Sequence, residues 1–184
     1  MSQYKIAVIV GSLRKESFNR KLSNALVKLA PSDFSFKELP IGDLPLYNQD
    51  NDGNPSNSVV QFKNEISKSQ GVLFVTPEYN RSIPGVLKNA LDNASRPYGQ
   101  SAWAGKPAGL LGASIGGQGT AMAQQHLRNI LAYLDMPTLA LPEAFIHVSD
   151  KYFDEAGNMA SPDNKAFLQR WMDRYVSWVK LQAK

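Results

Sequence analysis

The segment Tyr4–Val10, YKIAVIV, with the Gly11–Asn19 segment that follows it, GSLRKESFN, decides the fold. The first stretch is short, β-branched and almost entirely apolar, which is typical of a parallel strand covered on both faces. The strand ends at Gly11, and a polar loop follows. From Phe18 the apolar residues recur at helical spacing until Pro31, which predicts an amphipathic helix. The chain therefore opens with a strand, a loop and a helix.

The same alternation continues along the rest of the sequence. Further strands are predicted at residues 34–36, 71–76 and 107–113, and a fifth in two pieces, 138–141 and 144–148, that Pro142 interrupts. Apolar stripes predict further helices near residues 59–66, 84–94 with Pro84 first, 123–134, and 162–178 with Ser161 as N-cap. Residues 40–57 are expected to be irregular. Five such units predict a parallel sheet of order 2-1-3-4-5 with helices on both faces.

Composition excludes several kinds of chemistry. The chain has 184 residues and no cysteine, so disulfides, thiolate nucleophiles and cysteine-ligated metal centres are ruled out. The two histidines, His126 and His147, form no triad or metal motif, and we expect no metal site. The net charge is +4, but the basic residues are dispersed, which argues against nucleic-acid binding. We expect a cytoplasmic protein with no membrane segment, and a single domain over residues 1–184.

The loop after the first strand has the composition of a phosphate-binding site. Ser12, Ser17 and Asn19 are short polar donors at the start of a helix, where unpaired N–H groups attract anions, and Arg14 adds positive charge. The loop has a single glycine and no Gly-Lys-Ser/Thr ending, so a monophosphate fits better than a pyrophosphate or triphosphate. An ordinary capped turn would use the same serines and asparagine and remains open as an alternative.

Two further loops follow strands that are expected to end at the same edge of the sheet. Residues 76–85, TPEYNRSIPG, have prolines that fix the backbone and a tyrosine, Tyr79, that could cover a flat heterocycle. Residues 113–119, ASIGGQG, have three glycines that allow close approach of a ligand to the backbone. Each loop alone could be a tight turn, but three together at one edge favour a ligand site.

These motifs, in this order, resemble those of the NAD(P)H-dependent FMN reductase family, in its quinone and chromate reductase branch. The resemblance rests on GSLRKESFN, TPEYNRSIPGVLKNALDNASR, AGKP before the fourth strand and the glycine-rich loop after it. It spans nearly the whole chain and implies a flavodoxin-like three-layer fold with one bound FMN. One departure is Asn93, where the family often has an aromatic residue.

The resemblance also implies which residues form the site. Those around the FMN phosphate would be Ser12, Arg14, Ser17 and Asn19. Those against the isoalloxazine and ribityl groups would be Pro77, Glu78, Tyr79 and Asn80, with Ser114, Gly116 and Gly117 along the other edge. Family members commonly form homodimers or homotetramers.

The favoured hypothesis is an oxidoreductase that uses NADPH or NADH. Hydride from the nicotinamide would pass to flavin N5, and a small-molecule acceptor such as a quinone, chromate, an azo compound or free flavin would take the electrons. No catalytic side chain is predicted, because the task is positioning. Arg14, Lys15 and Arg81 could meet a 2′-phosphate. A flavodoxin-type electron carrier is the alternative, although such carriers tend to be acidic; a phosphate-binding regulator without flavin is weaker still.

Overall fold

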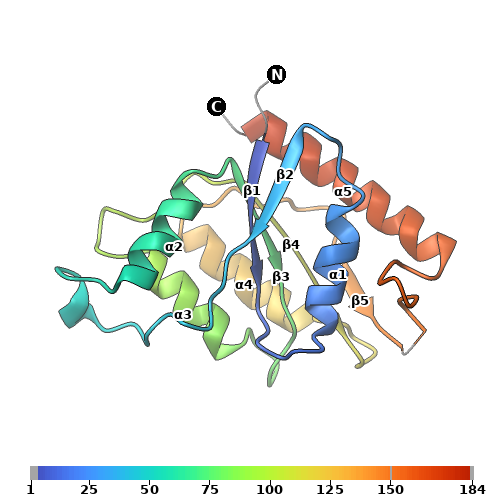
Figure 1. The fold of residues 1–184 in the computed structure, drawn as a ribbon, viewed down its shortest axis with the longest axis horizontal. Helices are drawn as coiled ribbons and strands as arrows, with labels where there is room; N and C mark the ends of the chain where they lie inside the picture. The colour runs from blue at the N-terminus through green and yellow to red at the C-terminus, as the bar shows by residue number, and fades with distance from the viewer. Residues whose placement is uncertain (1–3, 150, 183–184) are drawn as a thin grey trace.

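A computed structural model describes residues 4–149 and 151–182 as one five-stranded parallel sheet covered by helices (Figure 1). The strands are β1 (Tyr4–Val10), β2 (Phe34–Glu38), β3 (Gly71–Val75), β4 (Ala108–Ser114) and β5 (Phe145–His147). They lie in the order β2-β1-β3-β4-β5, so the predicted topology is confirmed. The order reverses between β1 and β3, and topologies of this type place ligands at the carboxyl ends of the strands near that point.

Five helices form the two outer layers of the sandwich. They are α1 (Phe18–Val27), α2 (Asn57–Ser67), α3 (Gly85–Ala94), α4 (Ala121–Tyr133) and α5 (Pro162–Gln182). Helices α1 and α5 share one hydrophobic core with the sheet, and α2, α3 and α4 share the other (Figure 1). No helix in the described part of the chain is long and apolar enough to cross a membrane.

Strand β1 shows how the sequence builds both cores. Its side chains alternate, so Ile6 and Val8 pack with α1 and α5, whereas Ala7 and Ile9 pack with the opposite helices. All four residues are buried. A strand with two buried faces cannot show polar alternation, which is why its sequence is a continuous apolar run.

The aromatic side chains of α5 lie mainly in the core that this helix shares with α1 and the sheet. The rings of Trp171 and Tyr175 are fully buried and stack with centroids 5.5 Å apart. They lie against Gly109 of β4, where a Cβ would come within 2.5 Å of the Tyr175 ring. Glycine is therefore required at this position by close packing rather than by its backbone angles.

Two details of the sequence prediction were wrong. Helix α3 begins at Gly85, and Pro84 is its N-cap residue with an extended ψ of 144° rather than its first helical residue. The first piece of the predicted fifth strand makes only an isolated bridge, between Thr138 and Ala108. It does not continue because the next carbonyl, that of Leu139, accepts a hydrogen bond from the Arg128 side chain.

The long irregular stretch between β2 and α2 is anchored by two amides of α3. Asn93 Nδ2 donates to Pro45 O at 3.0 Å, and Asn89 Oδ1 accepts from Tyr47 N at 2.8 Å. Both asparagines are buried. Asn93 thus ties this loop to helix α3 by hydrogen bonding.

Candidate active site

The loop between β1 and α1 presents free backbone donors at a helix N-terminus. Ser17 is the N-cap of α1, and its hydroxyl accepts a hydrogen bond from Arg20 N at 3.3 Å. In the described part of the chain, the N–H groups of Lys15, Glu16 and Ser17 have no protein acceptor. Because the helix dipole adds partial positive charge at this end, the loop is suited to bind an anion.

The hydroxyls of this loop are buried but retain a hydrogen to donate. Ser12 and Ser17 are 4% and 3% exposed. Ser12 Oγ accepts a hydrogen bond from Arg14 N at 3.4 Å. A hydroxyl that accepts in this way still has its own O–H free, so capping and phosphate binding are compatible roles for both serines.

Charged side chains stand at the outer rim of the loop. Arg14 is exposed, and its guanidinium lies 5.5 Å from the centroid of the Phe18 ring. The nearby Glu16 carboxylate forms an ion pair with Lys21 at 2.8 Å, and this partner, with a smaller contribution from Arg14, lowers the pKa of Glu16. The positive charge of Arg14 is therefore available for a ligand.

Arg20 holds the loop in shape, and the sequence interpretation missed it. Its Nη2 and Nη1 donate to the carbonyls of Ser12 and Arg14 at 3.1 and 3.2 Å, while Nε donates to Glu38 at 3.1 Å. These bonds hold two carbonyls of the loop in place. A cation in the first turn of a helix is unfavourable by itself, and that conflict was the available signal.

Asn19 joins the first loop to the end of β4. Its Nδ2 donates to Ala113 O and its Oδ1 accepts from Ala113 N, both at 2.9 Å. The side chain is 2% exposed. Its main contacts are therefore structural, and one amide hydrogen remains for a ligand.

The loop after β3 contains a tight two-residue turn. Tyr79 and Ser82 exchange two backbone hydrogen bonds of 2.9 and 3.0 Å. The residues between them, Asn80 and Arg81, both have left-handed backbones, with φ of 52° and 65°. Tyr79 is 53% exposed at the tip, which leaves its ring free to contact a ligand.

Glu78, the residue before Tyr79, caps a helix. Its Oε2 accepts a hydrogen bond from Ala123 N in the first turn of α4 at 3.0 Å. The N-cap residue of α4, Thr120, makes no side-chain cap bond, so the glutamate takes that role. A ligand contact from Glu78 would then come from its backbone or from its second carboxylate oxygen.

The loop between β4 and α4 offers open backbone. No atom outside its chain neighbours lies within 4 Å of the Cβ position of Gly117, and the nearest to that of Gly116 is Ser114 Oγ, at 3.5 Å. Ser114 Oγ also accepts from Gly116 N at 3.0 Å, and His147 Nδ1 lies 3.2 Å from Gly116 O. Side chains at these glycines would occupy space that a flat ligand can use.

Side-chain contacts bring the second and third loops together. Arg81 Nη1 donates to Gln118 Oε1 at 3.0 Å, and His126 Nδ1 shares a 3.0 Å hydrogen bond with Ser82 Oγ. Together with the bonds of Asn19 and Glu78, these contacts join all three loops at the carboxyl edge of adjacent strands β1, β3 and β4. The convergence follows from the predicted strand order, whereas the contacts that produce it are visible only in the structure.

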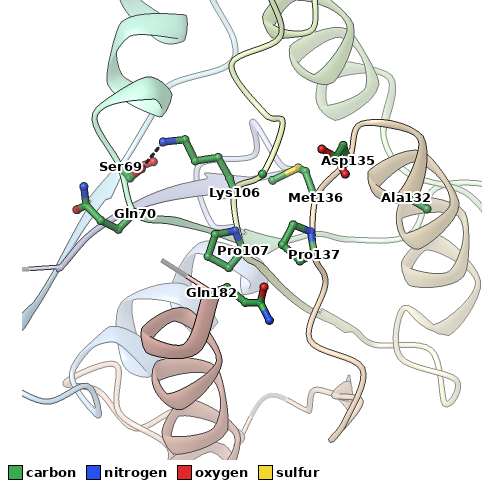
Figure 2. Close-up of a pocket in the computed structure, with 10 residues that line it drawn as sticks. Ser69, Gln70, Lys106, Pro107, Ala132, Asp135, Met136, Pro137 and Gln182 are labelled. Carbon is green, nitrogen blue, oxygen red and sulfur yellow. Dashed lines mark hydrogen bonds between the residues drawn. The ribbon is translucent and has the colours of Figure 1, made fainter. Parts of the chain in front are cut away.

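A cavity of about 600 Å³ lies at the opposite edge of the sheet (Figure 2). There Lys106 Nζ donates to Ser67 O at 2.9 Å and to Ser69 O at 2.5 Å, so it caps the C-terminal end of α2. Burial lowers the pKa of Lys106. The ammonium group of Lys106 already has partners, and the cavity adjoins the amino ends of β3 and β4. This cavity is therefore separate from the site formed by the three loops.

The residues at the carboxyl edge fit FMN. Free N–H donors and hydroxyls match a phosphate, the exposed Tyr79 matches a flat ring, and the open glycines leave room for that ring. In the described residues, no group of three or more histidine, aspartate or glutamate side chains is arranged to hold a metal ion.

Comparisons with known proteins identify the family of this chain. The family model for NADPH-dependent FMN reductase matches residues 4–150. A 2-hydroxy-1,4-benzoquinone reductase from Burkholderia sp. is 54% identical over 176 residues, covering 96% of each chain. A quinone reductase from Pseudomonas putida KT2440 is 51% identical over 183 residues, covering 98% of each chain.

A solved structure supports the same family assignment. The flavoenzyme NAD(P)H:(acceptor) oxidoreductase from Paracoccus denitrificans matches with a TM-score of 0.95 and 43% identity, covering 98% of this chain and 100% of its own. The chain therefore belongs to the NADPH-dependent FMN reductase family of oxidoreductases.

Proposed function

We propose that this chain is an FMN-dependent NAD(P)H:quinone oxidoreductase. The observation that carries the proposal is the convergence of three loops at one sheet edge, each with a different part of a flavin site. They are an anion cradle at α1, an exposed tyrosine after β3 and an open glycine backbone after β4. The names of the relatives, quinone reductase and benzoquinone reductase, support the same acceptor class.

FMN, when bound, supplies a ring that takes a hydride from NAD(P)H and passes electrons to the acceptor. The chain's own residues would bind and orient. Backbone N–H groups of residues 15–17 and the hydroxyls of Ser12 and Ser17 would hold the phosphate. Asn19, Arg20 and Glu78 would keep the loops in register through their backbone contacts.

The rim of the site favours planar apolar acceptors. Each loop carries one exposed apolar side chain, namely Leu13 at 57%, Tyr79 at 53% and Ile115 at 71% exposure. Exposed apolar groups gathered beside polar ones commonly mark a binding surface. A quinone fits such a rim, and chromate, azo compounds or free flavin are further candidate acceptors because the rim is open.

A second, weaker candidate is an electron carrier of the flavodoxin type, which would bind FMN but not turn over NAD(P)H. The net charge of +4 and the relatives named as reductases argue against it.

The proposal also covers the domain organisation, location and oligomeric state of the chain. We expect a single domain over residues 1–184, located in the cytoplasm, that forms a homodimer or homotetramer. Tyr98 and Tyr133 are 86% and 83% exposed beside a groove of about 720 Å³ between α3 and α4. Light scattering after gel filtration measures the oligomeric state directly.

Anaerobic stopped-flow measurements distinguish an NAD(P)H-dependent enzyme from a flavodoxin-type electron carrier. The purified protein is first saturated with FMN and then mixed with NADPH or NADH. Rapid bleaching, followed by recovery of colour when a quinone is added, is the expected result. Protein that binds no FMN would overturn the cofactor assignment, and FMN-loaded protein that neither nucleotide bleaches would favour the carrier.

A further inference from the structure

Arg81 occupies a backbone position that disfavours an arginine. It is the second residue of the turn between Tyr79 and Ser82, where both central residues have positive φ. Turns of this geometry strongly prefer Asn followed by Gly, because a Cβ is strained there. Asn80 satisfies the first preference, but Arg81 breaks the second. A strained backbone of this kind is a reason to look for a function of the side chain.

The Arg81 side chain spans two of the three loops. It is exposed, and Nη1 donates to Gln118 Oε1 in the glycine-rich loop at 3.0 Å. Gln118 is neutral, so this bond fixes the guanidinium without cancelling its charge. A guanidinium has five N–H donors, and the remaining ones can bind an anion in a planar, forked geometry.

No carboxylate at this edge neutralises Arg81. Within residues 4–149 and 151–182, neither Arg81 nor the other two rim cations, Arg14 and Lys15, forms an ion pair. The acidic residue nearest to Arg81 in sequence, Glu78, caps α4, and the one nearest to Arg14 and Lys15, Glu16, pairs with Lys21. The rim is therefore positively charged as well as apolar.

We propose that Arg81 determines specificity by binding an anionic group on the small molecule that occupies the flavin face. This inference rests on the proposed function and deepens it. The ligands that this site would accept share one feature, a phosphate or sulfonate-like anion next to a planar ring. The anion can come from the hydride donor, as the 2′-phosphate of NADPH, or from the acceptor, as an ionised substituent of a quinone.

Binding measurements on the FMN-loaded protein test the proposal without relying on turnover. Calorimetry gives dissociation constants for NADP⁺ against NAD⁺, and for a naphthoquinone sulfonate against the unsubstituted naphthoquinone. The variants are Arg81→Gly, Arg81→Gln and Arg81→Lys. Arg170→Gln, an exposed charge on α5, is the matched control for net charge.

We expect Arg81→Gly and Arg81→Gln to lose about tenfold in affinity for the anionic member of at least one pair, as for a lost charge-assisted hydrogen bond. The neutral member, FMN affinity and the Arg170→Gln variant should change little. Arg81→Lys should retain most of the preference. Arg81→Gly should also raise the melting temperature of the FMN-loaded protein by about 2 °C, because glycine relieves the strain.

The outcomes assign the source of the anion. A loss confined to NADP⁺ identifies the 2′-phosphate, and a loss confined to the sulfonate identifies the acceptor. If both preferences survive in Arg81→Gly and Arg81→Gln, or if the neutral ligands weaken equally, the proposal is overturned. Failure of the proposed function would look different, since the unmodified protein itself would then bind no FMN or fail to reduce quinones.

Discussion

The carboxylate of Glu78, in the loop after β3, accepts a hydrogen bond from the backbone N–H of Ala123 at the start of α4, 45 residues later in the chain. The bond places a negative charge at the positive end of a helix dipole. It also fixes the loop that carries Tyr79 relative to the glycine-rich loop that leads into α4. One side chain therefore contributes to helix stability and to the arrangement of the site.

Replacing Glu78 should weaken both the fold and the site. We expect Glu78→Ala to lower the free energy of unfolding by about 1 kcal/mol, the typical value of a lost cap, and Glu78→Gln to lose less because its amide oxygen still accepts. FMN affinity should fall in the same order. Thermal melts and FMN titrations measure the two effects. Glu155→Ala, an exposed carboxylate elsewhere, is the control, and equal effects of the two alanine variants would contradict the capping role.

Arg14 is expected to act on the FMN phosphate. Arg14→Ala should weaken FMN binding by about 1.5 kcal/mol, the low end for a hydrogen bond to a charged group, because the side chain is exposed and screened. The dissociation constants of FMN and riboflavin, measured by flavin fluorescence, provide an internal control, since riboflavin lacks the phosphate. A matching loss in riboflavin affinity would show that Arg14 does not act through the phosphate.

Asn19 should matter more for stability than its position in a loop motif suggests. Asn19→Ala removes two buried hydrogen bonds to Ala113 and leaves buried backbone groups without partners. We expect a loss of about 3 kcal/mol in the free energy of unfolding, measured with urea. Asn129→Ala, at an exposed position of α4, should change stability little. A loss below about 1 kcal/mol at Asn19 would mean that the loop rearranges to satisfy these groups.

Tyr175 gives a prediction about alkaline pH. Its hydroxyl is buried without a hydrogen-bond partner among the described residues, and burial raises the pKa of Tyr175 well above its usual value. The unfolded tyrosine ionises near pH ~10. The stability that the buried neutral form contributes is therefore complete below that pH and is lost as the pH rises toward the folded pKa.

Tyr175→Phe should consequently lose less stability than the unmodified protein between neutral and alkaline pH. At neutral pH it should be as stable or slightly more stable, because the hydroxyl that it removes has no partner. Urea unfolding across this pH range measures both effects. Tyr133→Phe, at a position that is 83% exposed, should show the same dependence of stability on pH as the unmodified protein. An unchanged alkaline slope in Tyr175→Phe would mean that this hydroxyl reaches solvent.

Much of the architecture was predictable because it depends on local patterns. The apolar run at Tyr4–Val10 and the helical stripe after Phe18 require nothing beyond neighbouring residues to interpret. The errors, at Pro84 and at residues 138–141, arose at the ends of elements, where a few backbone hydrogen bonds decide the boundary.

By itself, the sequence determined that strands and helices alternate, that three polar loops follow β1, β3 and β4, and that the first of these loops has the composition of a phosphate-binding site. Only the tertiary structure decided which side chains face that site and which hold it together. Asn19 and Glu78 turn to backbone groups 94 and 45 residues away, and Arg20 holds the loop that precedes it. Composition and periodicity report on local conformation and burial, whereas the partner of a polar side chain depends on which distant backbone groups packing leaves within reach.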